Sequence, residues 1–290
     1  MAPATVAATL PAQAKNRYPI ALFRLPVAIF VFALPVFGTV AALALVALGR
    51  VAPVHVALFV GGFVLTGLGI TVGYHRLLTH RSFETSPVLK AILLILGSMA
   101  AEGRPVDWVA NHLKHHAHTE QDDDPHSPTH GFFHSHWGWL FTFNAVEVDR
   151  YAGNLRTDRV AQWVGKTFMV WAILGYAIPF LIAGWEGLIW GGLFRQFAVQ
   201  NVTFAVNSVC HRWGSRAYPT NDQSTNNWVV GILGLGEGWH NNHHAFPGSA
   251  FHGLRWWQFD LSGQLIRWLE ATGLAWNVKR PRLAAQTAAK

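Results

Sequence analysis

The chain has 290 residues, of which 51% are hydrophobic, only 13% are charged and 14 are tryptophan. This balance is not that of a soluble globular domain and indicates an integral membrane protein. The formal net charge of +7 is suited to a protein that lies against the anionic lipids of a cytoplasmic membrane surface. The cations flank apolar segments and form no basic stripe, so a nucleic-acid partner is not expected. A single cysteine, Cys210, excludes an internal disulfide.

Two long apolar runs near the N-terminus predict the first two membrane crossings. Residues 1–24 are expected to form a cytoplasmic tail that carries several cations. The runs at about 25–48 and 54–72 contain no Lys, Arg, Asp or Glu except at their borders, and each covers the roughly 20 residues that a helix needs to span the hydrocarbon layer. The first run is too long for a cleaved signal, so an anchor is predicted.

The middle of the chain is mostly polar and contains one short apolar segment. Residues 88–101 are too few to span a bilayer and include Lys90, which favours an interfacial or buried helix. Two further crossings are predicted at about 163–183 and 188–206, joined by a turn at 184–187. Arg195 lies within the fourth crossing, where a charge needs a partner or water, and the sequence does not indicate one.

The distribution of Lys and Arg predicts the orientation of these crossings. Positive residues are common in the N-terminal tail, in the central loop and after His211, and they are rare in the two short turns. Both termini and the central loop are therefore expected in the cytoplasm. The predicted fold is an all-α integral membrane protein with one domain (25–290), four transmembrane helices, and a cytoplasmic helical cap from 73–162 and 207–290.

The 16 histidines are the most unusual feature of so apolar a chain, and many of them are clustered. His112, His115 and His116 have the i, i+3, i+4 spacing that puts three side chains on one helical face. His75 and His80 are five residues apart, so on a straight α-helix they would point about 140° away from each other. That pair either reaches two different metals or lies across a helix end. The further clustered histidines are His211, His240, His243 and His244.

These clusters contain more imidazoles than one metal coordinates and about as many as two metals need. A structural zinc site would usually include cysteine thiolates, while imidazole also suits iron and copper, so the residues indicate a metal centre without naming the element. Asp124 and His126 lie in a neighbouring acidic stretch that can orient ligating rings from behind. The alternative for that stretch is a solvated loop.

Several passages together resemble the membrane fatty acid desaturases of the stearoyl-CoA and bacterial acyl-lipid type. In chain order they are GYHRLLTHRSF (73–83), DWVANHLKHHAH (107–118), DPHSP (124–128), GFFHSHWGWL (131–140), NSVCH (207–211) and GEGWHNNHHAFP (236–247). The resemblance covers about 73–257 and implies two iron ions. Its implied ligands are His75, His80, His112, His115, His116, His211, His240, His243 and His244, with Asn207 contacting one iron through water.

The resemblance also implies a fatty acyl desaturase that uses dioxygen and two external electrons. Two hydrogens are removed from adjacent methylenes, and the products are a cis double bond and water. The resemblance implies the Δ9 position for this double bond. Trp108 and Thr203 match family positions that line the substrate channel. On the second crossing Phe63, Gly67 and His75 share one face, and Phe63 is expected to close the tunnel and limit acyl length.

The match departs from the animal acyl-CoA enzymes at two places. Those enzymes carry basic residues that contact the CoA head group where this chain has Ala110 and Phe143. Losing two cations makes a membrane lipid at least as good a carrier as CoA. The histidines outside the implied ligand set are expected mostly at the surface or behind the ligands; they include His118, His130, His134, His136 and His252.

Two rival functions remain from the same residues. One is a hydroxylase or related oxygenase with the same histidine clusters; the other is a membrane metal-binding or transport protein, which would place its ligands along a path through the crossings. The chain shows no flavin, nicotinamide or haem signature, so a separate electron donor of the ferredoxin or cytochrome b5 kind is expected. The expected location is the inner membrane of a bacterium.

Overall fold

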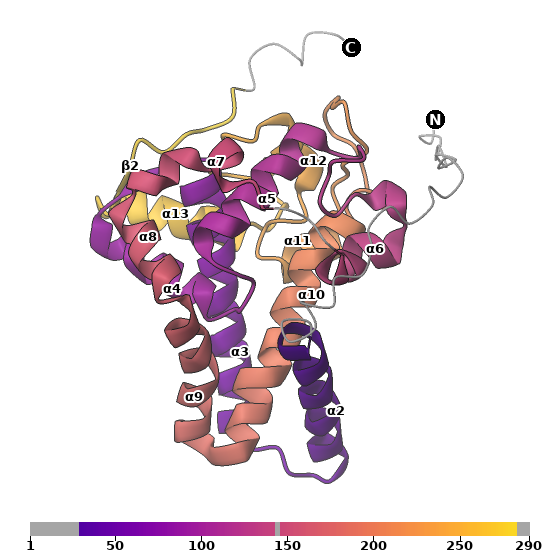
Figure 1. Cartoon of the computed structure of the whole chain (residues 1–290), viewed down its shortest axis with the longest axis vertical. Coiled ribbons are helices and arrows are strands. Elements are labelled where there is room, and N and C mark those ends of the chain that lie inside the picture. Colours follow the sequence, from indigo (N-terminus) through magenta and orange to yellow (C-terminus); the bar gives the residue numbers. More distant parts are fainter. Residues whose placement is uncertain (1–28, 143–145, 283–290) are drawn as a thin grey trace.

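The computed structural model describes residues 29–142 and 146–282, so the predicted tail at 1–24 and Phe143 lie outside the described residues. The described residues are mostly helical and form a stalk of long helices beneath a broader cap (Figure 1). Two short antiparallel strands, β1 (Glu84–Thr85) and β2 (Ala275–Trp276), join the two ends of the cap sequence. The long helices of the stalk are candidate membrane spans by length and composition.

The first two apolar runs form long helices close to the predicted ranges. The π-helical turn η2 (Ile29–Ala33) leads into α2 (Leu34–Ala47), and together they make a 19-residue candidate span. Helix α3 (Pro53–Leu68) continues without interruption into η3 (Gly69–Thr79), giving 27 residues. The second crossing was predicted to end at residue 72, but the helix continues into the cap because its last turns are buried on all sides.

The remaining apolar segment folds as a hairpin. Helix α9 (Phe168–Gly187), η7 (Leu188–Phe194) and α10 (Arg195–Ser208) make the third candidate span, of 41 residues. Ala183 and Gly184 have non-helical backbone angles, and the chain reverses there (Figure 1). Gly184 has φ of 60°, which glycine adopts without steric cost. By length and composition the described residues thus contain three candidate spans, the last of which has two arms.

The predicted start of the third crossing at residue 163 is wrong. Residues Arg159–Lys166 form a separate helix, α8, whose N-terminus is capped by the carboxylate of Asp158, which accepts from the amides of Val160 and Ala161. Thr167 then breaks the helix, and the long arm begins only at Phe168. Helix α8 packs against α4 of the cap, so this stretch belongs to the cap.

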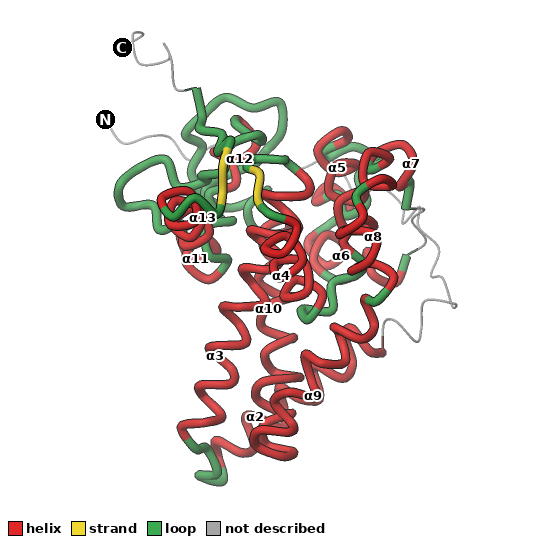
Figure 2. The backbone as a smooth tube through the Cα atoms, turned by 90° about the vertical axis from the view of Figure 1, so that its left-hand side faces the viewer, coloured by secondary structure: helices red, strands yellow, loops and turns green. Residues whose placement is uncertain are grey.

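The cap is built from short helices on both sides of the upper end of α3 (Figure 2). The segment predicted as a short buried or interfacial helix is α4 (Pro87–Ser98), which Ser86 caps and which packs closely on η3. Its Lys90 pairs with Asp158 at 2.9 Å. The other cap elements are α5 (Pro105–His118), η4 (Pro128–His130), α6 (Phe132–His136), η5 (Gly138–Phe141), α7 (Val148–Tyr151), η6 (Gly153–Thr157), α11 (Trp228–Leu233), α12 (His240–Ala245) and α13 (Leu261–Ala271).

Arg195, which lacked a partner in the sequence, binds backbone carbonyls. The side chain is 1% exposed, and its Nη2 donates to the carbonyl of Gly175 at 3.0 Å. That carbonyl would normally accept from residue 179, but Pro179 has no N–H. Nη1 donates to the carbonyl of Met99 at 2.8 Å, at the C-terminus of α4. The guanidinium therefore satisfies two carbonyls that the helices leave unpaired and joins the hairpin to the cap.

We expect Arg195→Met to destabilise the protein. The substitution keeps most of the volume but leaves two buried carbonyls without donors, and hydrogen bonds to charged groups contribute about 1.5–3 kcal/mol each. The apparent melting temperature in detergent, followed by tryptophan fluorescence, should fall by several degrees. Arg159→Met, on an exposed position of α8, is the control. Equal melting temperatures for Arg195→Met and the wild type would contradict this account.

Candidate metal centre

The nine histidines named as implied ligands come together in the cap in two adjacent groups. Within each group the ring nitrogens lie within 4.8 Å of one another. The first group contains His75, His80, His112, His116 and His243, and the second contains His115, His211, His240 and His244. The structure therefore divides the nine residues between two sites, each with enough imidazoles to hold a metal ion.

Helix α5 lies between the two groups and supplies both. His112 and His116, which are one turn apart, face the first group, and their Nε2 atoms are 3.0 Å apart. His115 is rotated toward the second group, where its ring centroid is 5.4 Å from that of His211. The i, i+3, i+4 spacing thus serves two neighbouring sites and not a single one.

His75 and His80 belong to the same group because the end of the second long helix is a π-helix. The amide of His80 donates to the carbonyl of His75, which is the i to i+5 bond of that geometry. With about 4.4 residues per turn, residues five apart lie on nearly the same face. The two Nε2 atoms are 3.1 Å apart. The π-helix therefore replaces the 140° separation that a straight α-helix would impose.

Four of the nine rings are oriented by carboxylates on their Nδ1 side. Nδ1 of His75 lies 2.6 Å from a carboxylate oxygen of Glu237, which fixes the proton on Nδ1 and leaves a lone pair on Nε2. The other three pairs are His115 with Asp124 at 3.0 Å, His211 with Glu120 at 2.9 Å, and His244 with Asp222 at 2.6 Å. Asp124 is the carboxylate that the sequence predicted in this role.

The oriented nitrogens face one another, which tests whether a metal fits. Nε2 of His75 lies 3.3 Å from Nε2 of His243 and 3.1 Å from that of His80. With its proton held on Nδ1, His75 presents the lone pair of Nε2 to both neighbouring rings. Nitrogens bound at about 2.1 Å and at right angles around one metal are about 3.0 Å apart, close to the observed separations. In the second group Nε2 of His244 is buried without a hydrogen-bond partner, as an open ligand position requires.

The protonation states suit metal binding. Burial lowers the pKa of His211 to about 3 and that of His244 to about 4, so both rings are neutral near pH 7. Burial alone would raise the pKa of Asp222, but its hydrogen bonds with His244 and Ser224 hold the pKa well below its usual range. His211 and His244 are thus neutral rings, and His244 is held by the ionised carboxylate of Asp222.

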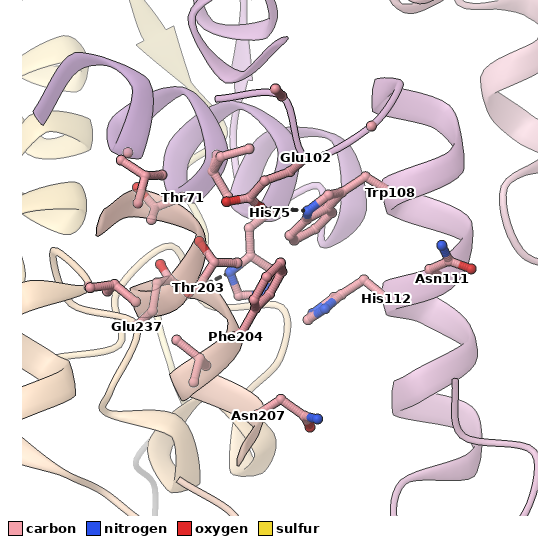
Figure 3. Close-up of a pocket in the computed structure, with 18 of the residues that line it drawn as sticks. Thr71, His75, Glu102, Trp108, Asn111, His112, Thr203, Phe204, Asn207 and Glu237 are labelled. Carbon is pink, nitrogen blue, oxygen red and sulfur yellow. Dashed lines mark hydrogen bonds and ion pairs between the residues drawn. The ribbon is translucent and has the colours of Figure 1, made fainter. Parts of the chain in front are cut away.

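A cavity of about 900 Å³ leads to the histidines. Its lining includes the four residues predicted to contact substrate, which are Phe63, Gly67, Trp108 and Thr203. Trp108 and Thr203 lie close to His75 and His112 at the inner end (Figure 3). Most of the lining is apolar, and the polar part includes the histidines and the ionisable Glu102, Arg104 and Asp107 near the start of α5.

Asn207 lines the same cavity beside the second group. Its Nδ2 donates to the carbonyl of His126 at 2.6 Å, which fixes the orientation of the amide, and its Oδ1 is buried without a partner. A buried acceptor directed into a polar site is what a water-mediated contact to a metal requires. His126 lies behind the ligands, with its ring centroid 4.7 Å from that of His115.

The fatty acid desaturase family model matches residues 49–273 of the chain. The chain belongs to the fatty acid desaturase family. It is accordingly an oxidoreductase, and the family relation agrees with the histidine groups and the long apolar helices.

Three relatives show the range of substrates among similar proteins. The desaturase is 44% identical over 219 residues to the sn-1 stearoyl-lipid 9-desaturase of Anabaena variabilis, covering 75% of this chain and 80% of that protein. It is 39% identical over 269 residues to the hex-5-enoyl-(acyl-carrier protein) acetylenase of Moorena producens, covering 86% and 84%. It is 41% identical over 226 residues to the icosanoyl-CoA 5-desaturase of Limnanthes douglasii, covering 76% and 63%.

Several residues of the desaturase site were not predicted. Glu237 lies three residues before His240, within a passage that already attracted attention, so its spacing was a usable signal. Glu120 and Asp222 come from loops distant in sequence and carry no local signal. His252, expected only as a residue outside the ligand set, is buried with its ring centroid 4.5 Å from that of His243 and its Nδ1 3.4 Å from Glu237.

The other histidines outside the groups are not all at the surface. His118 contacts the hydroxyl of Tyr151 at 2.9 Å, and His130 is partly exposed. His134 is buried, and so is His136, whose Nδ1 lies 2.7 Å from the hydroxyl of Ser208. His136 therefore supports the junction of α6 with α10.

A second recess, of about 530 Å³, reaches the histidines from another side. His80 and His116 of the first group and His244 of the second line it, together with Asp222 and the loop before it. The centre is thus accessible both from the apolar cavity and from this more polar opening.

Asp222→Asn should weaken metal binding by about 10- to 100-fold, the usual effect of losing a carboxylate that orients a ligating histidine. The amide keeps the shape of the side chain but loses the charge that fixes the proton on Nδ1 of His244. The dissociation constant for Fe(II), measured by competition with a chelator, reports the change. Asp149→Asn, at an exposed position, is the control. An unchanged constant for Asp222→Asn would show that this contact does not orient the ligand.

Proposed function

We propose that the protein introduces a cis double bond into a fatty acyl chain, using two iron ions, dioxygen and externally supplied electrons. The single observation that supports this most strongly is the continuity of the apolar cavity with both histidine groups. The proposed iron ligands are the nine histidines of the two groups, with Asn207 acting through water. A metal transporter would have its ligands spread along the membrane crossings, whereas the histidines of both groups are clustered in the cap.

The proposed topology has four crossings, with both termini and the metal centre on the cytoplasmic side. The hairpin supports it, because a straight 41-residue helix would be about 60 Å long, twice the hydrocarbon thickness. Each arm alone has about the length that one crossing needs. The bias of Lys and Arg toward the tail, the central loop and the C-terminal region supports the cytoplasmic assignment. We propose the inner membrane of a bacterium as its location.

In this proposal the iron centre supplies the oxidising power that removes hydrogen from an unactivated methylene. The chain's own residues position the substrate. Trp108 and Thr203 border the inner end of the cavity, where they hold the acyl chain against the ligand edges. The apolar lining excludes bulk water from that end. Glu237 and the other three carboxylates hold the protons on Nδ1 of their histidines. The Nε2 atom of each of these rings therefore keeps a lone pair with which it can bind a metal.

For the acyl carrier we propose a membrane lipid, and for the position of the double bond Δ9. Ala110 is buried and carries no charge at a place where acyl-CoA enzymes are expected to bind the head group. The name of the relative from Anabaena variabilis specifies a stearoyl lipid and the 9-position. The name of the relative from Limnanthes douglasii specifies CoA and the 5-position, so product analysis must resolve both properties.

We propose that a separate ferredoxin or cytochrome b5-like protein delivers the electrons at the polar recess beside His80, His116 and His244. The ring edges in this recess offer a short route to both metals, and the acyl cavity remains free for substrate. Desaturation by the purified protein, measured with each purified donor in turn, distinguishes the two kinds of donor. If neither donor supports desaturation, this assignment is contradicted.

Cells that express the protein should gain monounsaturated acyl chains, and cells that express His115→Ala should not. His115 belongs to the second group, and its loss removes one imidazole without altering the cavity near Phe63. The measurement is a lipid profile resolved by double-bond position and by acyl carrier. Hydroxylated chains would indicate an oxygenase instead, and no new product with iron and a competent donor present would contradict an acyl substrate.

Phe63→Ala should shift the products toward longer acyl chains, because the ring of Phe63 lines the cavity on the α3 side and its removal lengthens the space. Phe59→Ala is the matched control. Phe59 is one turn away, stacks on Phe194 with centroids 4.5 Å apart and does not line the cavity. Chain-length distributions of the products measure the effect. The same distribution for Phe63→Ala and wild type would show that another residue limits length.

A further inference from the structure

The depth of each cap element in the membrane follows from its level along the second long helix. This helix begins at Pro53, next to Arg50, which pairs with Glu186 at the tip of the hairpin. These charges mark the far boundary of the hydrocarbon layer. At 1.5 Å per residue, Gly67 lies about 21 Å and Thr71 about 27 Å from that end, both within the roughly 30 Å of hydrocarbon.

Two parts of the C-terminal cap contact the helix at this level. A Cβ atom on Gly67 would lie 2.9 Å from Cδ1 of Leu235, so the residues directly after α11 pack against α3 here. The hydroxyl of Thr71 lies 2.6 Å from that of Ser262, at the start of α13. Helix α11 also packs against α10, the second arm of the hairpin. The region containing α11 thus lies beside the long helices in the lower part of the cap, at about the height of α6 (Figure 2).

The outward side of this region is apolar and aromatic. Trp228, Val229, Ile232 and Leu233 of α11 are all exposed. A short distance away Trp256 is 97% exposed and Trp257 is 54% exposed. We call these six residues the aromatic face.

The aromatic face is held together by Trp239, which lies beneath it. A Cβ atom on Gly231 of α11 would lie 2.9 Å from the ring of Trp239, and that ring is 5.4 Å from the ring of Trp257. The indole N–H of Trp239 donates to the carbonyl of Phe259 at 2.7 Å, which fixes the loop that carries Trp256. The exposed side chains are therefore displayed by a rigid support.

We infer that the aromatic face is seated in the cytoplasmic leaflet as an interfacial anchor of the cap. Its level on α3 places it at the boundary between hydrocarbon and head groups, where tryptophan is enriched. A six-residue helix cannot span the bilayer, but one apolar side can lie in the interface. The exposed Arg255, directly before Trp256, adds a cation that anionic head groups would attract. This inference depends on the membrane topology and not on the reaction catalysed.

Seating α11 in the leaflet also fixes the wall of the substrate cavity. Leu233, Gly234 and Leu235 line that cavity, and Glu237, which orients His75, follows two residues later. The bilayer surface is thereby connected through one short segment to the metal centre. An acyl chain in the same leaflet would then lie at the same depth as the part of the cavity wall that this segment forms.

The test is the membrane depth of single nitroxide labels on the full-length protein in phospholipid nanodiscs. Ile232→Cys reports on α11 and Trp256→Cys on the loop. Ile173→Cys, exposed on α9, is the bilayer control, and Trp276→Cys, on β2 in the upper part of the cap, is the aqueous control. The native Cys210 is buried and should not be labelled. Depth is read from the ratio of collisions with dioxygen to collisions with a water-soluble nickel chelate.

We expect the label at 232 to give a ratio close to that at 173 and several-fold above that at 276. The label at 256 should give an intermediate ratio, because tryptophan of this kind lies at head-group depth. A label at 232 that matches 276 would overturn the inference, since the face would then be in water. Low collision rates with both reagents would also overturn it, because a protein surface would then cover the face.

Discussion

The centre of the cap is a set of buried imidazole rings whose inner nitrogens face one another. Four carboxylates hold the protons on the outer nitrogens of four of these rings, which turns the lone pair of each inner nitrogen toward the neighbouring rings. A metal ion in each group would bind these lone pairs together with those of the other rings. The helices of the cap bring the nine rings into this arrangement.

The long helices deliver part of this ligand set. The second long helix changes to π-helical geometry at Gly69 and supplies His75 within that segment and His80 directly after it. Arg195 joins the hairpin to the base of α4 by satisfying the carbonyl that Pro179 leaves unpaired. Residues of the same helices line the cavity, so in the proposed function one arrangement would supply ligands, substrate channel and membrane anchor.

Local patterns predicted the parts of this structure that depend on short-range spacing. Apolar runs identified the long helices, and the repeated histidine spacing identified α5 and α12. Features that need tertiary contact were not predictable: the carboxylates of Glu120 and Asp222 come from loops, and the partners of Arg195 are backbone groups. The i+5 pair of histidines was ambiguous because a sequence does not distinguish an α-helix from a π-helix. The start of α9 was missed because α8 is also rich in apolar residues.

Metal stoichiometry tests the two-group account most directly. Protein purified without metal and then loaded anaerobically with Fe(II) should bind two ions per chain, while His240→Ala, which affects only the second group, should lose one of them. X-ray absorption should show iron surrounded by nitrogen and oxygen at about 2.1 Å, without sulfur. One ion per folded wild-type chain, or equal loading in the variant, would contradict the division of the histidines into two metal sites.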